Sequence, residues 1–571
     1  MTAISGIFTS PMNFDDILPH IGEFGAYQKT IYLLLCLPAS IPSALTLFNS
    51  IFISATPDHW CRVPELDNYA HVFAPDVIKN LSVPMIEAGK FYKCEMYDVN
   101  YTAVIERARM YGVLPVSEES WPRKPCDNGW HYDTTFYVRT LVTQTDAVCE
   151  DAWKVSMAQT TFYIGNVIGS VFFGYIGDRF GRKTSLIVVI ILNVLMGLLT
   201  SFTTSYEWYI TYRGVIGLTF PAIFQIPVIM GMELMSPDKR TFSGMLVCIF
   251  FALAMMMLAG LASLLRDWFS LSLVCSVPFT ALLTLWWAVP ESPRWLLSHN
   301  RLIEAELLVH KIAKRNGKKI SSNFLQSQFE EKDHLTDTRT EMREAFSRRT
   351  LLKYPNIMKK VLIVSFCWTT NTMVYNGLSF GITSLGMSDY LSFSISAAAE
   401  IPGILLAWAT MDRIGRRPIM IFTMLLGGVA CTSTCFLPPD AVWISVSFNS
   451  IGKMAITASF AIIYVYGAEL FPTVLRAFAM GFASMFAGLS LALTPQILFL
   501  GQVHGTEVSN LIFGSLVWLE ESVSFSSQRL QKLTFLRRCK KERHLEKTST
   551  SGAAQERATQ IPSKKSNHQW W

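Results

Sequence analysis

The sequence predicts an all-α membrane protein whose many spanning helices form two related halves. Three observations support this fold class. Of the 571 residues, 51% are hydrophobic and only 16% are charged, whereas soluble domains carry about 25% charged residues. The apolar residues fall in repeated blocks of about 20, the length that crosses a hydrocarbon core. A pattern of charged residues in the first half also recurs in the second. This composition argues against a cytosolic enzyme and against a mostly disordered chain.

Eleven apolar blocks are long enough to span a membrane, and the first covers residues 27–54. This block is too long for a signal peptide and has no clear small-residue cleavage site, so we interpret it as a transmembrane helix. The other blocks lie near 155–177, 184–203, 208–230, 242–265, 270–289, 361–380, 391–410, 418–436, 442–466 and 478–500. Each is expected to be helical, because barrel strands are shorter and alternate in polarity.

Two polar segments set the predicted orientation. Residues 291–360 are rich in lysine and arginine, and the positive-inside rule places them in the cytoplasm. Residues 55–152 are on balance acidic and contain four cysteines, which are Cys61, Cys94, Cys126 and Cys149. Four cysteines in one aqueous loop indicate two disulfides in an oxidising compartment, with three possible pairings. The loop is therefore expected to be extracellular and the N-terminus cytoplasmic.

The same loop carries two N-glycosylation sequons, at Asn80 and at Asn100. A lone sequon is weak evidence, but two in a loop that is independently placed outside indicate glycosylation. The other seven cysteines lie in the spans or the tail and are expected to pack as small hydrophobic residues.

These segments predict the domain order along the chain. It runs through a cytoplasmic N-terminus (1–26), an N-terminal transmembrane half that includes the extracellular loop (27–290), a cytoplasmic loop (291–360), a C-terminal transmembrane half (361–519) and a basic disordered tail (520–571). The last apolar run, residues 511–519, makes only about 14 Å of helix, whereas a hydrocarbon core is about 30 Å thick. The twelfth helix is therefore predicted to be truncated.

The charge repeat lies at the ends of predicted spans. Asp178 recurs as Asp412, 234 residues later, and Glu233 recurs as Glu469, 236 residues later. A nearly constant offset indicates two parallel six-helix halves, an internal symmetry found in transporters. An ordinary excess of cations on the cytoplasmic side explains the basic residues of the pattern, but not acidic residues at equal offsets.

Charged groups at neighbouring helix ends can form charge-assisted pairs across the two halves. Such pairs would hold the cytoplasmic side shut and would separate when it opens. The candidates for this gating network are Asp178, Arg179, Arg182, Glu233, Arg240, Glu291, Arg294, Asp412, Arg413, Arg416, Glu469 and Arg476.

Several motifs resemble those of a known family. Gly174–Lys183 and Met411–Arg417 are similar to the loop signature of the major facilitator superfamily. The motifs that resemble its organic cation, carnitine and organic anion transporter family are Ala55–Cys61, Pro125–Trp130, Asp146–Cys149, Arg266–Trp268, Pro290–Leu296 and Tyr466–Thr473. The resemblance runs from about residue 20 to 500 and stops abruptly after Gly514, as a frameshift, an alternative exon or a faulty gene model would make it do.

The resemblance implies a major facilitator fold and alternating-access transport at the plasma membrane. The expected substrates are small organic cations or zwitterions such as carnitine. The expected partners are this substrate and the lipid bilayer, without nucleic acid, and the oligomeric state is left open. The sequence shows no nucleotide-binding loop, metal-ligand cluster or nucleophile motif, so no enzyme activity, cofactor or metal is expected.

Glu400, in the predicted eighth span, is the clearest candidate for substrate binding. An ionisable residue within a span is energetically expensive and is therefore a functional candidate by default. A carboxylate that faces the cavity could attract an ammonium group. Alternatively, Glu400 stabilises the helices as the partner of a cation elsewhere, or lies near the external end of its helix.

Aromatic residues are the second element of the predicted site, because ring faces attract desolvated cations. Trp368 and Tyr375 are seven residues apart, hence on one face of the seventh helix. The resemblance places these two residues, with Phe224, Phe460 and Tyr464, where the family has its cavity aromatics. Without the resemblance, such residues would be expected to pack or to anchor helices at the interface.

One position departs informatively from the family pattern. Cation-preferring relatives often carry Asp in the eleventh span and anion- or carnitine-preferring relatives Arg, whereas this chain has Gly488, and Pro221 stands where some relatives have Lys. With no cationic residue recognised in the cavity, cations are favoured over anions. An organic anion carrier, and a non-transporting receptor or partner subunit with an incomplete last helix, are the alternatives.

Overall fold

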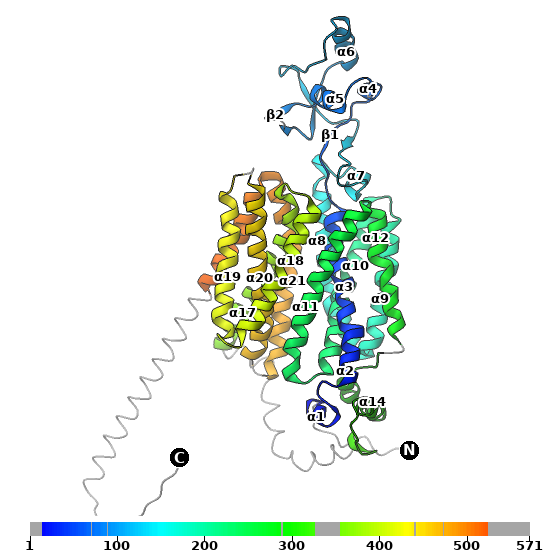
Figure 1. Ribbon diagram of the computed structural model, residues 1–571, viewed down its shortest axis with the longest axis vertical. Coiled ribbons are helices and arrows are strands. Elements are labelled where there is room, and N and C mark those ends of the chain that lie inside the picture. Colours follow the sequence, from blue (N-terminus) through cyan, green and yellow to red (C-terminus); the bar gives the residue numbers. More distant parts are fainter. Residues whose placement is uncertain are drawn as a thin grey trace, which may run out of the picture. The chain divides into compact units, whose positions relative to one another are not determined.

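The computed structural model describes residues 14–523, except residues 70, 88–89, 287–288, 326–354, 439–440 and 472. Long helices dominate it, as the sequence predicts (Figure 1). The chain divides into two compact units, Met1–Val517 and Trp518–Trp571. Apart from residues 518–523 at the end of the last described helix, the features described below belong to the first unit, and the tail beyond residue 523 lies outside the described residues.

The first half begins with short helical segments and continues with long helices. Its elements are η1 (Phe14–Asp16), α1 (Leu18–Ile21), α2 (Ala26–Ile31), η2 (Tyr32–Cys36), α3 (Leu37–Ile53), α8 (Trp153–Phe180), α9 (Arg182–Ser201), α10 (Tyr206–Glu233), α11 (Pro237–Leu265), α12 (Trp268–Ser276) and η4 (Val277–Trp286). Two helices outside the predicted spans follow, α13 (Pro293–Ser298) and α14 (Leu302–Arg315).

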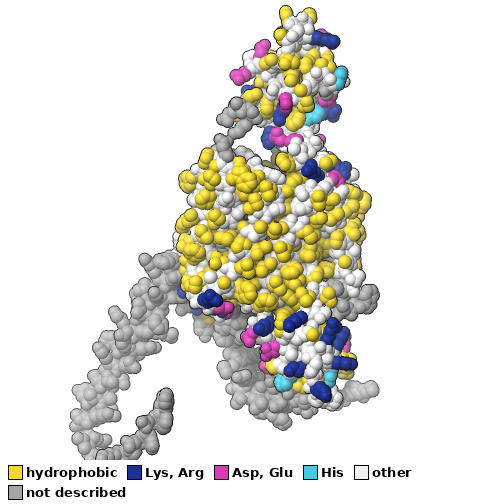
Figure 2. Space-filling model, viewed as in Figure 1, with side chains coloured by type: hydrophobic (Ala, Val, Ile, Leu, Met, Phe, Trp, Pro, Cys, Tyr) yellow, Lys and Arg dark blue, Asp and Glu magenta, His cyan; other side chains and the backbone are white. Residues whose placement is uncertain are grey.

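The second half repeats this pattern of long helices. Its elements are α17 (Pro355–Gly381), η6 (Ile382–Leu385), α18 (Asp389–Met411), α19 (Arg416–Ser433), η7 (Thr434–Phe436), α20 (Val442–Leu470) and α21 (Thr473–His504). A helix thus lies at each of the eleven predicted spans. Among the described residues, eight helices are long and apolar enough to cross a membrane by length and composition. Hydrophobic side chains cover the middle of the helical bundle on the face shown in Figure 2.

Glycines allow neighbouring helices to approach closely within each half. A Cβ on Gly169 of α8 would lie 1.9 Å from the carbonyl oxygen of Leu218 on α10. In the second half, a Cβ on Gly427 of α19 would lie 2.7 Å from Ile456 of α20. Packing of small residues at helix crossings is a common source of cohesion in membrane bundles.

The charge repeat of the sequence is also a repeat of backbone geometry. Gly181, between α8 and α9, has a φ of 101°, and Gly415, between α18 and α19, has a φ of 102°. Only glycine adopts this region readily. Each glycine follows its motif aspartate by three residues, so the two halves turn in the same way at the same place.

The loop between α3 and α8 is a small folded region. Three two-stranded antiparallel sheets pair β1 (His59–Cys61) with β6 (Trp130–Tyr132), β2 (Met85–Glu87) with β3 (Lys90–Phe91), and β4 (Glu95–Tyr97) with β5 (Arg123–Pro125). Short helices lie between and after the strands: α4 (Pro64–Asp67), α5 (Pro75–Ser82), α6 (Tyr101–Met110), α7 (Leu141–Thr145) and η3 (Cys149–Asp151).

Two disulfides join this loop, and they select one of the three pairings that the sequence leaves open. Cys61 is bonded to Cys126, and Cys94 is bonded to Cys149. A core of buried side chains that includes Leu81, Tyr97 and Tyr101 fills the loop. The Tyr101 hydroxyl donates to the carbonyl oxygen of Tyr97 at 2.6 Å.

The last described helix covers residues 506–523. It is longer than the nine-residue apolar run, because polar residues extend it on both sides. Phe513 and Val517 are buried together with Val374 and Met424, and a Cβ on Gly377 of α17 would lie 2.4 Å from the Phe513 ring. The end of the apolar sequence therefore packs against the second half.

Candidate functional site

Glu400 lies in the middle of α18 and takes part in a buried ion pair. Its side chain is 3% exposed, and its Oε1 is 3.1 Å from the Nζ of Lys453 on α20, whose side chain is completely buried. The Tyr375 hydroxyl of α17 donates to both Glu400 oxygens, at 3.0 and 3.2 Å. Three helices of the second half thus meet at one carboxylate.

Lys453 has further contacts in addition to its ion pair with Glu400. Its Nζ donates to the Tyr375 carbonyl oxygen at 3.1 Å and to the Ser379 hydroxyl. The same ammonium lies 3.0 Å from the centroid of the Tyr375 ring. Lys453 thus shows how an ammonium group is accommodated between this carboxylate and this ring.

The buried lysine corrects one step of the sequence interpretation. The expectation that the cavity lacks cationic residues is wrong, because Lys453 and Arg213 of α10 are both buried within the helices. Each is a single cation within a long apolar block. An ionisable residue within a span is a functional candidate by default, and this rule, which selected Glu400, could also have selected Lys453 and Arg213. The preference for cations over anions loses that support, and the alternative that Glu400 pairs with a cation is what the structure shows.

Four of the five predicted aromatic residues form a continuous row that starts at this ion pair. The Tyr375 ring stacks on Phe460 with centroids 5.8 Å apart, and Phe460 contacts Tyr464 at 5.3 Å. Tyr464 in turn meets Trp368 edge-on at 4.5 Å. Trp368 is buried, whereas Tyr464 is 49% exposed. The row therefore links the buried carboxylate to an exposed ring.

The other two predicted residues occupy different places. Phe224 lies on α10 in the first half, where its ring is 5.8 Å from that of Phe251 on α11. Gly488 lies on α21 against the first half, and a Cβ there would be 2.9 Å from Val167 of α8. A larger side chain at Gly488 would therefore require at least the Val167 side chain to shift, so glycine suits the close contact of α21 with α8.

The two halves are joined at the end of the bundle that carries the loop. The Tyr137 hydroxyl of the loop donates to Asp389 of α18 at 2.6 Å, and the Tyr390 hydroxyl donates to the carbonyl oxygen of Phe136 at 2.9 Å. Phe52 of α3 stacks on Tyr390, with ring centroids 5.5 Å apart. Hydrogen bonds and a ring contact thus join the loop and α3 to α18 at this end.

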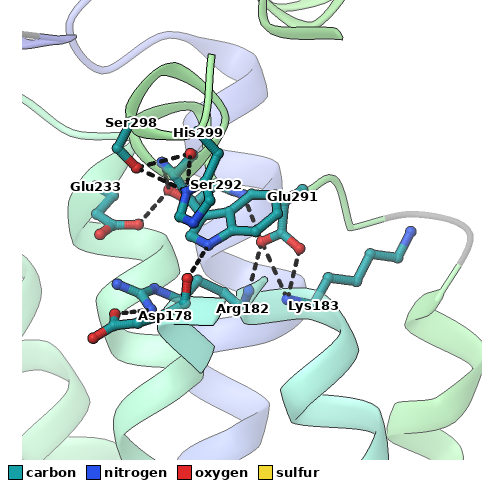
Figure 3. Close-up of polar contacts among 9 residues, drawn as sticks. Asp178, Arg182, Lys183, Glu233, Glu291, Ser292, Ser298 and His299 are labelled. Carbon is teal, nitrogen blue, oxygen red and sulfur yellow. Dashed lines mark hydrogen bonds and ion pairs between the residues drawn. The ribbon is translucent and has the colours of Figure 1, made fainter. Parts of the chain in front are cut away.

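At the opposite end, Glu291 organises the turn between α8 and α9 (Figure 3). Its Oε1 accepts from the backbone amides of Arg182 at 2.8 Å, Lys183 at 3.2 Å and Ser292 at 3.0 Å. A carboxylate at a helix N-terminus satisfies otherwise unpaired amides and interacts favourably with the helix dipole. Nearby, the Ser292 hydroxyl donates to Glu233.

Asp15 is a member of this region that the sequence did not reveal. It lies on η1 and pairs with Arg240 at 2.6 Å and with Arg294. Burial lowers the pKa of the Arg294 guanidinium, an effect that Asp15 opposes. Its partners lie more than 200 residues away in the sequence, so no local pattern could have indicated the pairing.

Four of the remaining network candidates form ion pairs in the described part of the chain, each within one half. Asp178 contacts Arg182 at 2.5 Å, Asp412 contacts Arg416 at 2.9 Å, and Arg416 contacts Glu469 at 3.0 Å. Arg179 donates to the Tyr175 hydroxyl, Arg413 is exposed, and the side chain of Arg476 lies outside the described residues. All the ion pairs named here join residues of one half, rather than the pairs across halves that the sequence suggested.

Comparisons with known proteins give a consistent result. The profile of the family described as sugar (and other) transporter matches residues 128–518. Organic cation transporter 1 of Caenorhabditis elegans is 35% identical over 87% of this chain and 82% of its own length. The carcinine transporter of Drosophila melanogaster is 36% identical over 86% and 73%, and the human organic cation/carnitine transporter 2 is 31% identical over 89% and 90%.

Solved structures agree on the fold. The proton:xylose symporter XylE of the major facilitator superfamily, bound to 6-bromo-6-deoxy-D-glucose, superposes with a TM-score of 0.55 at 16% identity, covering 88% of this chain and 96% of that chain. The inward-open conformation of XylE from E. coli gives a TM-score of 0.55 at 15% identity, covering 87% and 95%. At this identity the likeness concerns the fold alone.

Proposed function

The chain belongs to the sugar (and other) transporter family of the major facilitator superfamily and is a membrane transporter, and we propose that it carries small organic cations or zwitterions, such as carnitine, by alternating access. The observation that carries this proposal is the buried carboxylate of Glu400, which is bonded to Tyr375 and continues into the row of rings from Phe460 to Trp368. Rings and a carboxylate together favour a desolvated cation.

In this proposal, a substrate ammonium group replaces the Lys453 ammonium at Glu400. The exchange keeps the carboxylate compensated, whereas the Lys453 ammonium is then left with neutral acceptors alone. Lys453 keeps its contacts with Ser379 and the Tyr375 carbonyl while the substrate enters. A zwitterion suits the same pair, because its carboxylate can face Lys453 while its cationic group faces Glu400.

We assign the end of the bundle that carries the loop to the extracellular side and the N-terminus to the cytoplasm, at the plasma membrane. The loop has two disulfides, which persist in oxidising compartments. In the conformation described, the extracellular end is closed by Tyr137, Asp389 and Tyr390. The named cytoplasmic ion pairs lie within single halves, so they stay intact when the halves separate there.

The bond between Tyr137 and Asp389 is expected to favour this closed extracellular end. Tyr137→Phe removes a hydrogen bond worth about 1 kcal/mol, which corresponds to about a fivefold shift toward the outward-open state. A cysteine introduced at the buried position Ala397 should then react about five times faster with an impermeant maleimide added outside. Tyr132→Phe is the matched control, because the Tyr132 hydroxyl donates to Asp146 within the loop at 2.8 Å. Equal labelling of both variants would contradict the assignment.

The loop is also proposed to be glycosylated at Asn80 and Asn100, whose side chains are exposed. Asn100 is the N-cap of α6, and its Oδ1 accepts from the Ala103 amide at 3.1 Å while its Nδ2 is the atom that a glycan would modify. Asn100→Asp should therefore lose the glycan and keep the cap. With Asn80→Gln, it should abolish the mobility shift caused by glycosidase. A wild-type protein without any shift would count against the extracellular assignment.

The proposed substrate class is tested by radiotracer uptake into cells that express the protein. Tetraethylammonium, carnitine and an aromatic carboxylate are compared, with and without depolarisation of the membrane. Saturable uptake of tetraethylammonium or carnitine is expected, and uptake should be normalised to surface amount measured by biotinylation. Saturable uptake of the aromatic carboxylate alone would favour the anion carrier, and no uptake at normal surface level would favour a receptor or partner subunit.

A further inference from the structure

A second buried charge lies in the first half, away from the residues assigned above. Arg213 of α10 is 3% exposed. Its Nη1 donates to Asn49 Oδ1 at 3.0 Å and to the Thr46 carbonyl oxygen at 3.5 Å, both on α3. Its Nη2 donates to Gln159 Oε1 of α8 at 3.4 Å, and its guanidinium carbon lies 4.5 Å from the centroid of the Phe162 ring.

All the acceptors that Arg213 contacts are neutral. Amide and carbonyl oxygens orient the guanidinium, but they carry no charge to compensate it. The ion pairs found in the described part of the chain leave Arg213 out, in contrast to Lys453 with its partner Glu400. A buried ion that lacks a counter-charge costs several kcal/mol, and a charge within a spanning helix marks a functional place by default.

The same place holds hydrogen-bond donors without an acceptor. Arg213 Nε, Gln159 Nε2 and Ser50 Oγ are buried and form no hydrogen bond in the described structure. Ser50 lies one turn from Thr46 on the face of α3 that meets Arg213. Each of these three atoms carries a hydrogen, so the surroundings of the guanidinium are short of both negative charge and acceptors.

We propose that Arg213, Gln159 and Ser50 form a binding site for a small monovalent anion. The anion supplies the missing charge and accepts from the donors that are left free. Its chemistry is that of a chloride ion or of the carboxylate of an acidic or zwitterionic solute, since a guanidinium binds both and matches a carboxylate with two parallel bonds.

The site is placed to influence the conformation of the carrier. Tyr163 lies one turn after Gln159 on α8, and its hydroxyl donates to Asn376 Oδ1 of α17 at 3.2 Å. This bond joins the two halves next to Tyr375, which holds Glu400. An anion that fixes Gln159 and Arg213 therefore stabilises the side of α8 that contacts the second half.

The test measures thermal unfolding of the full-length protein in nanodiscs at constant ionic strength. Sodium chloride, sodium acetate and sodium HEPES are compared at about 100 mM, with HEPES as a reference anion too large for the site. A ligand present at ten times its Kd shifts the folding equilibrium about 11-fold, which is expected to raise the Tm of a chain of this length by about 1 °C. A rise in Tm with acetate alone identifies the ligand as a carboxylate. A rise in Tm with chloride identifies it as an inorganic anion. Equal Tm in all three salts overturns the proposal.

Two variants locate the effect. Gln159→Glu places a carboxylate beside Arg213, so it should raise Tm in HEPES and abolish the response to added anion. Arg213→Gln should also abolish the response to added anion. If Arg213→Gln does not fold, Gln159→Glu alone tests the proposal. The matched control is Gln144→Glu, the same change at a glutamine that contacts Thr203 and Trp268 instead, and it should keep the response. A response that persists in Gln159→Glu places the anion elsewhere and overturns the proposal. Because no transport is measured, these outcomes are independent of the substrate panel.

Discussion

Glu400→Gln is expected to abolish cation uptake and to destabilise the protein by about 3–5 kcal/mol, because removing one partner of a buried ion pair leaves the other charge uncompensated. The stranded group is Lys453, whose side chain is completely buried 3.1 Å from Glu400. Uptake normalised to surface amount measures the loss of transport, and thermal unfolding of purified protein measures the loss of stability.

The double variant Glu400→Gln with Lys453→Met separates binding from stability. Replacing both members of a buried ion pair by neutral groups is often neutral or stabilising, so Tm should return toward the wild-type value. Uptake of tetraethylammonium should remain absent, because no carboxylate is left to accept the cation. If the double variant transports tetraethylammonium at the wild-type rate, the pair has only a structural role and the proposed site is wrong.

Glu291→Ala is expected to slow turnover at least tenfold and to cost about 3 kcal/mol of stability. The carboxylate accepts from the backbone amides of Arg182, Lys183 and Ser292, and unpaired amides at a helix start typically cost about 1 kcal/mol each. Substrate affinity should change little, because Glu291 lies at the helix ends and Glu400 lies in the middle of α18. Thermal unfolding, direct binding of labelled substrate and uptake distinguish these effects.

Asp178→Asn is the control for this prediction. Asp178 also contacts the turn, but its side chain is 74% exposed and its pair with Arg182 is local. Exposed pairs of this kind are worth about 0.3–0.5 kcal/mol, so its Tm should stay close to wild type. Equal losses in the two variants, or a loss of binding that parallels the loss of uptake in Glu291→Ala, would be inconsistent with the role assigned to Glu291.

The positions of the helices could be predicted because lipid imposes length and backbone pairing on every span. The paired motifs at Asp178 and Asp412 also predicted where the backbone repeats, and Gly181 and Gly415 show the same positive φ. The disulfide pairing could not be derived, since four cysteines in one loop fit three patterns and only the folded strands bring Cys61 to Cys126.

The candidate site was predicted only in part. Glu400 is conspicuous as a lone carboxylate in an apolar span, and helical spacing placed Trp368 and Tyr375 on one face. The partner of Glu400 depends on which faces of α17, α18 and α20 meet, and a single sequence does not define those faces. Lys453 was therefore missed, although the expense of a buried charge applies to it equally. For the same reason, Asp15 gave no sign of its pairs with Arg240 and Arg294.

The most direct test of alternating access is counterflow in proteoliposomes that contain the purified protein. Vesicles are loaded with unlabelled tetraethylammonium or left empty, and the early uptake of labelled tetraethylammonium is compared. In such a carrier, the binding site changes its side of the membrane more slowly when it is empty than when it holds substrate. We therefore expect labelled tetraethylammonium to enter the loaded vesicles several times faster than the empty ones. Label that enters loaded and empty vesicles without saturation and at the same rate, or that does not enter either, would contradict the assignment of this chain as a carrier of organic cations.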